Sequence, residues 1–184
     1  EGKEISIHLE EPIGEVRSDK REVLSKKGKT YPYDMLLVAT GGSAFVPPIK
    51  GVEKKGVFAL RTMKDALEMK EFSAKVKQAI LIGGGLVGLE TGGALLRREV
   101  KVAVIEHNPR ILPRQMDEAG AQILQKKMEE VGFSFFLNGQ SDEILGKEKV
   151  EGLRLKDGRV VEGQMVIITA GVRPNILLAK EMGL

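Results

Sequence analysis

Apolar runs and amphipathic stretches alternate along most of the chain, a pattern typical of α/β proteins. Apolar runs without polar interruption predict strands that are buried on both faces, as in a parallel sheet. They lie at residues 35–39, 79–82 and 165–169, and further strands are predicted at 57–60, 100–105 and 133–137. Helices are predicted between several of these runs, at about residues 62–75, 86–98 and 117–131. The pattern therefore predicts a doubly wound, Rossmann-like domain.

Two stretches are instead typical of short antiparallel strands and turns. The alternation at residues 5–9 predicts a half-buried strand, and residues 23–31 predict a hairpin around Gly28. Residues 142–162 predict a three-stranded meander whose hairpin turn is Asp157-Gly158. We expect this meander to be inserted in the α/β domain, with a β-rich part preceding that domain.

An internal repeat links the two β-rich stretches. Gly28 precedes the run Met35–Val38 and Gly41, whereas Gly158 precedes the run at 165–168 and Gly171; both glycine pairs are 13 residues apart (41 − 28 and 171 − 158). The second copy follows a complete strand–loop–helix–strand unit at residues 79–106. Only about 25 residues precede the first copy, so we expect its equivalent unit upstream of residue 1.

A dinucleotide-binding fingerprint lies within that unit. Gly83-x-Gly85-x-x-Gly88 follows a predicted strand and opens a helix, and Glu106 ends the next strand, 23 residues after Gly83 (106 − 83). The first glycine allows a tight turn, the second lets a pyrophosphate approach the backbone, and the third lets the helix pack on the sheet. A carboxylate at position 106 accepts hydrogen bonds from a ribose and repels a 2′-phosphate, which favours NAD over NADP.

Other candidate residues are selected only by their positions in the predicted helices and strands. Glu90 is expected in the first turn of the helix, where ordinary helix-start electrostatics explains a carboxylate equally well. Thr40-Gly41 and Ala170-Gly171 end predicted buried strands, and ligands of open α/β sheets bind at the carboxyl ends of strands. These turns are therefore candidate cofactor contacts.

The composition narrows the chemistry. The 184 residues include no Cys and two His, which excludes disulfides, thiol nucleophiles and Cys-ligated metals, so we expect no metal site. The net charge of +3 is small and dispersed, so no nucleic-acid surface is expected. No run of 18 apolar residues suits a membrane span, and we expect a cytoplasmic protein without a membrane partner. No residue is predicted to act as a general acid, base or nucleophile.

Several ordered motifs resemble one family across essentially the whole chain. They are Tyr33–Gly41, the Pro47-Pro48 crossover to Leu60-Arg61-Thr62, Ile82–Glu90, Leu112-Pro113-Arg114 with Met116-Asp117, and Ala170–Asn175. Together they resemble the FAD-dependent pyridine nucleotide–disulfide oxidoreductases. Within the family the chain is most similar to the group of NADH oxidases, rubredoxin or ferredoxin reductases and NADH-dependent nitrite reductase large subunits.

The resemblance implies cofactors and contact residues. Two sets of residues are implied, one for NADH and one for the edge of a flavin site. The NADH set is Gly83, Gly85, Leu86, Val87, Gly88 and Glu106, with Glu90 near the nicotinamide and Gly171 lining its pocket; the FAD set is Ile13, Ala39, Thr40 and Gly41. The implied activity is hydride transfer from NADH to FAD, with electrons passing on to an unidentified acceptor.

The chain also departs from this family. The family's first glycine fingerprint, its redox cysteines where present, and its later Gly-Asp segment are absent from these 184 residues. We therefore expect an incomplete FAD-binding part at 1–47, a crossover at 48–62 and an NAD(H)-binding domain at 63–184, with the chain inactive by itself. Its partners would be NADH and the FAD domain of the full-length chain; a homo-oligomer is left open. The alternative is a non-catalytic NAD(H)-sensing or NAD(H)-binding module.

Overall fold

The computed structural model describes residues 5–184 and divides the chain into two compact units. One unit contains the chain up to Ser43 together with Pro174–Leu184, and the other contains Ala44–Arg173. The chain passes between the units at β4 (Gly42–Ala44) and β13 (Val172–Pro174), which pair with each other. These units are defined by contacts, and the expected boundaries at residues 47 and 62 remain a proposal about domain organisation. Residues 1–4 of the expected first segment lie outside the described residues.

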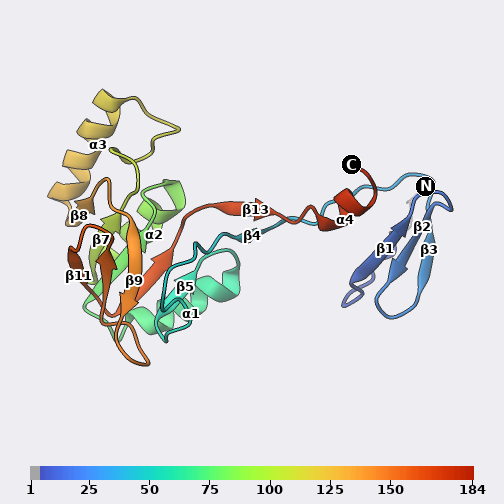
Figure 1. Ribbon diagram of the computed structural model, residues 1–184, viewed down its shortest axis with the longest axis horizontal. Coiled ribbons are helices and arrows are strands. Elements are labelled where there is room, and N and C mark those ends of the chain that lie inside the picture. Colours follow the sequence, from blue (N-terminus) through green and yellow to red (C-terminus); the bar gives the residue numbers. More distant parts are fainter. Residues whose placement is uncertain (1–4) are drawn as a thin grey trace. The chain divides into compact units, whose positions relative to one another are not determined.

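A parallel sheet forms the centre of the larger unit (Figure 1). Its strands have the order β5-β12-β6-β7-β8, and each neighbouring pair is parallel. The strands are β5 (Val57–Ala59), β12 (Met165–Ile168), β6 (Gln78–Ile82), β7 (Lys101–Ile105) and β8 (Phe133–Phe136). The predicted α/β fold is therefore confirmed.

Three helices cover one face of this sheet. They are α1 (Met63–Ser73), α2 (Leu86–Leu96) and α3 (Glu118–Glu130). Alternate strand residues such as Leu81, Val104 and Ile167 pack with Leu89 of α2 in one buried cluster. Because successive strand residues point to opposite faces, the sheet needs a second cover.

The predicted meander supplies that cover. Its strands β9 (Ser141–Leu145), β10 (Gly152–Leu155) and β11 (Val160–Glu162) form an antiparallel sheet. Leu153 and Leu155 are buried against Ile80 and Ile105 of the parallel sheet. The inserted β-meander is therefore confirmed, and both faces of the parallel sheet are buried.

The smaller unit contains an antiparallel sheet of β1 (Ile13–Arg17), β2 (Glu22–Ser25) and β3 (Thr30–Pro32), and the short helix α4 (Leu177–Glu181). The hairpin is as predicted, but the strands predicted at 5–9 and 35–39 are wrong, because neither segment is a strand. Met35 and Leu37 are 93% and 86% exposed. A buried central strand needs a paired strand on each side, and the described residues provide none for either segment.

The predicted repeat has a structural counterpart. Gly28 and Gly158, 130 residues apart (158 − 28), have φ of 86° and 89°. In each turn the glycine amide donates to the carbonyl three residues earlier, at 3.0 Å. In the second copy the repeated apolar run forms β12, an interior strand with β5 and β6 on either side. In the first copy, at residues 35–38, the run is largely exposed. The same sequence pattern is thus a strand only where it has neighbours.

The ends of the two copies form equivalent hydrogen bonds. The amide of Asn175 donates to the carbonyl of Gly41, and the amide of Phe45 donates to the carbonyl of Gly171, each at 2.9 Å. Residues 41 and 171 are equivalent in the repeat, as are residues 45 and 175, because each pair is 130 residues apart (171 − 41 and 175 − 45). The two bonds therefore join equivalent positions, with the donor and acceptor copies exchanged. The repeat therefore extends through both glycine turns.

Candidate functional site

The glycine loop lies at the carboxyl end of β6, where it turns into α2. Gly83 has φ of 118°, and a Cβ at this position would lie 2.6 Å from the carbonyl oxygen of Thr169. A Cβ at Gly88 would lie 2.3 Å from the Gly83 oxygen and 2.7 Å from Thr169 Oγ1. Both positions therefore require glycine, for the turn and for close packing of the helix on the strand.

Thr169 has a part in this loop that the sequence interpretation missed. Its hydroxyl lies 3.2 Å from the carbonyl oxygen of Ile82 and 3.1 Å from that of Gly83, to which it donates. Its backbone amide also donates to Ile82, at 2.9 Å. A threonine after a buried strand carries no recognisable signal by itself, because the contact depends on β12 lying beside β6.

Gly85 differs from its neighbours because it has open space around it. A Cβ there would have no atom within 4 Å, and this residue is the N-cap of α2 without a side-chain capping bond. Leu86 and Val87, the first two helical residues, are 57% and 54% exposed. The first amides of a helix have no intrahelical acceptor, so this end offers N–H donors and a partial positive charge to an anion.

Glu106 is bonded to this loop although it lies beyond β7. Its side chain is buried, with the residue 6% exposed. Oε2 accepts the amide of Gly84 at 2.7 Å, while Oε1 accepts the backbone and side-chain amides of Asn108 at 2.8 and 2.7 Å. The structure therefore brings the predicted acidic residue and the glycine loop together.

The segment after Glu106 holds the loop from its other side. The amide of Leu112, which has φ of 45°, donates to the carbonyl of Gly84 at 3.0 Å. The guanidinium of Arg110 donates to the carbonyls of Pro113 and Met116, each at 3.3 Å, and so braces the same segment. Asn108, Leu112 and Thr169 all position the loop, and the sequence analysis gave none of them this role.

Two further predicted NADH contacts have defined places. Glu90 is exposed and is the fifth residue of α2, whose first turn contains no acidic residue. The expected position in the first turn is therefore wrong: α2 begins at Leu86, as predicted, and Glu90 lies just beyond its first turn. Gly171 follows the end of β12 with φ of 112° and open space at its Cβ position. Their contacts with a cofactor stay predictions.

The predicted flavin-edge residues lie in the smaller unit. Ile13, Ala39 and Thr40 line one hollow of about 540 Å³, and Gly41 lines a neighbouring hollow together with Ala39 and Thr40. Asn175 fixes this turn: Thr40 Oγ1 donates to its carbonyl at 2.6 Å, and its Nδ2 donates to the Thr40 carbonyl at 3.0 Å. The hydroxyl of Thr40 is thus already used within the protein.

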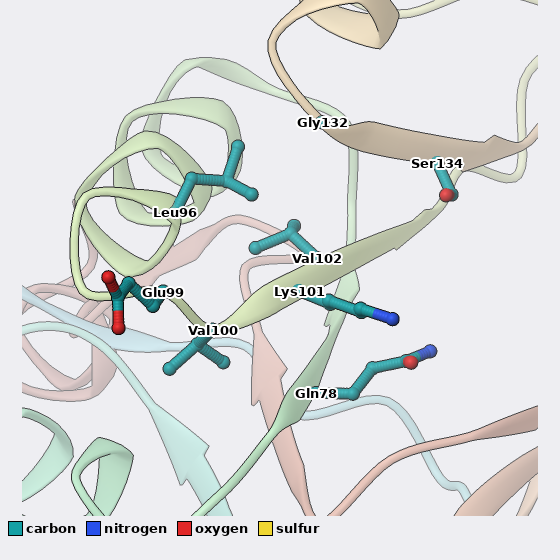
Figure 2. A pocket seen from close by; sticks show the side chains of 8 residues that line it. All are labelled: Gln78, Leu96, Glu99, Val100, Lys101, Val102, Gly132 and Ser134. Atoms are coloured by element: carbon teal, nitrogen blue, oxygen red, sulfur yellow. The ribbon is translucent and has the colours of Figure 1, made fainter.

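A different hollow opens at the amino ends of β6, β7 and β8 (Figure 2). It has a volume of about 390 Å³ and is lined by Gln78, Leu96, Glu99, Val100, Lys101, Val102, Gly132 and Ser134. Ligands of open α/β sheets bind at the opposite, carboxyl ends of the strands. We therefore assign the candidate dinucleotide site to the glycine loop and not to this hollow.

Two other kinds of site are absent from residues 5–184. No group of three or more His, Asp or Glu side chains in this part of the chain is placed to hold a metal ion. No helix within the same residues is long and apolar enough to cross a membrane.

Comparison with known proteins agrees with this geometry. The family model for pyridine nucleotide-disulphide oxidoreductases matches residues 1–184. The chain is 39% identical over 184 residues to nitrite reductase [NAD(P)H] of Bacillus subtilis, covering all of this chain and 23% of that protein. It is 38% identical over 171 residues to NADH oxidase of Methanocaldococcus jannaschii, covering 91% of this chain and 38% of that one.

A solved structure has the same fold. A ferredoxin reductase from Rhodopseudomonas palustris superposes with a TM-score of 0.91 at 23% identity, over 96% of this chain and 44% of that one. The chain thus spans less than half the length of the relatives it matches. With the glycine loop, the buried glutamate and a family match over every residue, the chain belongs to the pyridine nucleotide-disulphide oxidoreductases.

Proposed function

We propose that this chain is the NADH-binding portion of an FAD-dependent oxidoreductase. In the proposed reaction a hydride passes from NADH to FAD, and the electrons pass on to an acceptor. The chemistry belongs to the two cofactors, while the protein binds and orients them. The observation that carries the proposal is the open side of Gly85 at the uncapped start of α2, beside the buried carboxylate of Glu106.

The residues of the loop fit the dinucleotide. The space beside Gly85 and the free amides of the first helical turn suit a pyrophosphate, which carries negative charge. Glu106 lies at the end of the next strand and accepts from Gly84, so the carboxylate is fixed close to where an adenosine ribose would lie. Gly171, at the end of β12, leaves room at the same edge of the sheet.

For FAD, the described residues offer an edge and not a complete site. Ile13, Ala39, Thr40 and Gly41 surround hollows of the smaller unit, next to an exposed apolar segment at residues 35–37. Because Thr40 donates its hydroxyl to Asn175, the groups that this turn still offers a flavin are chiefly backbone amides. We infer that the rest of the flavin site, including its own phosphate-binding loop, comes from other residues of a longer chain.

Names of relatives support the same proposal. They include nitrite reductase [NAD(P)H], NADH oxidase and rubredoxin-NAD(+) reductase, whose acceptors differ. Hydride transfer between NADH and FAD is therefore the step that we propose for the present protein. We also propose a cytoplasmic location, as the sequence analysis expects.

Anaerobic reduction tests this proposal in the full-length protein loaded with FAD. Addition of NADH should bleach the visible absorbance of the flavin, and the variant Gly85→Ala should require a higher concentration of NADH for half-maximal bleaching. A protein that binds NADH and contains no flavin would instead favour the alternative, a non-catalytic NAD(H)-binding module. A flavin that NADH leaves oxidised would overturn the proposed reaction.

A further inference from the structure

The hydrogen bonds of Glu106 are distributed unequally between its two carboxylate oxygens. Oε1 accepts two donors, both from Asn108: the backbone amide at 2.8 Å and Nδ2 at 2.7 Å. Oε2 accepts one donor, the amide of Gly84, at 2.7 Å. Asn108 therefore occupies one oxygen completely, while the glycine loop occupies half of the other.

These hydrogen bonds leave the Glu106 carboxylate few free acceptor positions for a ligand. An ionised carboxylate has about four lone-pair positions, two on each oxygen. Three of those on Glu106 are used within the protein, so one position is left, and it is on Oε2. That oxygen is also the one next to the glycine loop.

The backbone keeps this arrangement in place. The carbonyl of Glu106 accepts the amide of Gly139 at 2.9 Å, and the carbonyl of Asn108 accepts the amide of Asn138 at 3.1 Å. Both carbonyls are thus bonded to the segment after β8, and the amide of Asn108 stays directed at Oε1. The backbone donor to Oε1 is therefore fixed by the fold, while the second donor to Oε1 is the side-chain Nδ2 of Asn108.

We propose that Asn108 restricts Glu106 to a single hydroxyl of the adenosine ribose, which the carboxylate accepts on Oε2. The inference rests on the proposed NADH site. An adenosine ribose presents two neighbouring hydroxyls, and a carboxylate with both oxygens open accepts both. Here the Nδ2 of Asn108 already occupies the position that the second hydroxyl would need. Asn108 is therefore a specificity-determining residue that acts through Glu106.

Binding of three ligands to this chain tests the proposal without any variant. The ligands are NADH and its two analogues that lack either the 2′- or the 3′-hydroxyl of the adenosine ribose. Removal of one hydroxyl should weaken binding about tenfold or more, as for a hydrogen bond to a charged group, and removal of the other by less than about twofold. Equal losses for the two analogues would overturn the proposal.

The variant Asn108→Ala adds a second, directional test. It removes Nδ2 and keeps the backbone amide, so one position on Oε1 opens. Deletion of the hydroxyl that does not affect binding to the wild type should then weaken binding to the variant several-fold, relative to NADH binding by the same variant. If Asn108 only maintained the fold, all three ligands would weaken together, and that result would contradict the proposal. Gln122→Ala, which removes an exposed amide bonded to Glu118, is the matched control.

Failure of this inference is distinguishable from failure of the proposed function. A folded wild-type chain that binds none of the three ligands would contradict the NADH site itself. A chain that binds NADH, but loses the same affinity with either hydroxyl deleted, would leave the NADH site intact and overturn only the role of Asn108.

Discussion

Glu106 and Gly84, 22 residues apart in the sequence, are joined by a 2.7 Å hydrogen bond from the glycine amide to a buried carboxylate oxygen. On the other side of the same glycine, the carbonyl accepts the amide of Leu112 at 3.0 Å. The two parts of the dinucleotide fingerprint are therefore one bonded structure. A change at Glu106 should affect the shape of the glycine loop as well as contact with a ribose.

The first prediction concerns the choice between NADH and NADPH. The chain should bind NADH at least about tenfold more tightly, because a 2′-phosphate would face the carboxylate of Glu106 in a confined place. Calorimetric titration with both nucleotides measures the ratio of dissociation constants. Equal affinities, or tighter binding of NADPH, would show that Glu106 does not select the nucleotide.

Basic side chains next to Glu106 would oppose that effect by contacting a 2′-phosphate. Arg110 is bonded to the carbonyls of Pro113 and Met116, which leaves the exposed His107 as the remaining candidate of the two. His107→Ala should therefore leave NADH binding unchanged and should not tighten NADPH binding. A large loss of NADPH affinity in this variant would reveal a recruited imidazole.

The second prediction separates two adjacent glycines of α2. A Cβ at Gly92 would lie 2.5 Å from a ring carbon of Phe133 and 2.9 Å from Leu81, whereas a Cβ at Gly93 has only Arg97 Nη1 nearby, at 3.7 Å. Gly92→Ala should lower the free energy of unfolding by about 1–3 kcal/mol through overpacking. Gly93→Ala should raise it by up to about 1 kcal/mol through helix propensity.

Urea denaturation of the two variants and the wild type measures this difference. Gly92 thus has a packing role at the contact of α2 with β6 and β8, while nothing in the structure explains a glycine at position 93. A Gly93→Ala variant as destabilised as Gly92→Ala would contradict this distinction.

The third prediction concerns the start of α1 and its response to acid. Asp65 accepts the amide of Thr62 at 2.7 Å, and Thr62 Oγ1 accepts the amide of Asp65 at 3.2 Å, and these two bonds form a capping box. The bond from the Thr62 amide, followed by the Thr62 hydroxyl and the Arg61 amide, holds the pKa of Asp65 below its ordinary value of 3.8. A carboxylate with a lowered pKa stabilises the fold above its unfolded pKa.

This stabilisation should be lost as the pH falls through the lowered folded value. Asp65→Asn should therefore be less stable than the wild type at pH 7, and the difference should shrink once the pH falls below 3.8. Thr62→Ala should cost about 1 kcal/mol. Urea midpoints over a pH series measure both effects, and a difference that is unchanged in acid would argue against the carboxylate as its source.

Most of the larger unit was predictable because its segments pair with one another. The runs at residues 79–82, 100–105 and 165–168 became buried strands since each has a neighbour within the chain. The run at 35–39 is entirely apolar, as β12 is, but it has no such neighbour, and most of it is exposed. An apolar segment forms a buried strand only where the rest of the fold provides neighbouring strands that pair with it.

Residues of the candidate site could be predicted from the sequence chiefly where the local backbone conformation requires a particular residue type. Gly83 and Gly88 follow from a turn and a close contact that leave no room for a Cβ. Thr169, Asn108 and Leu112 act through hydrogen bonds between distant segments, and no spacing rule identifies them. The glutamate was found by its distance from the glycines, but its bond to Gly84 was not.

The fourth prediction is that this chain, purified as printed, is colourless and does not turn over NADH. The single glycine loop with a helix start that we identified in residues 5–184 is assigned to NADH, so a flavin has no comparable place for its phosphates. A visible absorbance scan and an NADH-oxidation assay with added FAD measure both properties. A stoichiometric flavin peak, or steady consumption of NADH, would contradict the assignment.

Titration of NADH into the wild type and into Gly85→Ala tests the central claim most directly. The added methyl meets no protein atom within 4 Å, so the variant should keep the stability of the wild type. It should nevertheless bind NADH about tenfold more weakly or worse, since the methyl occupies space that the pyrophosphate needs. Gly93→Ala, in the same helix but away from the loop, should bind as the wild type does. Undiminished binding by Gly85→Ala would contradict the claim that NADH is held at this loop.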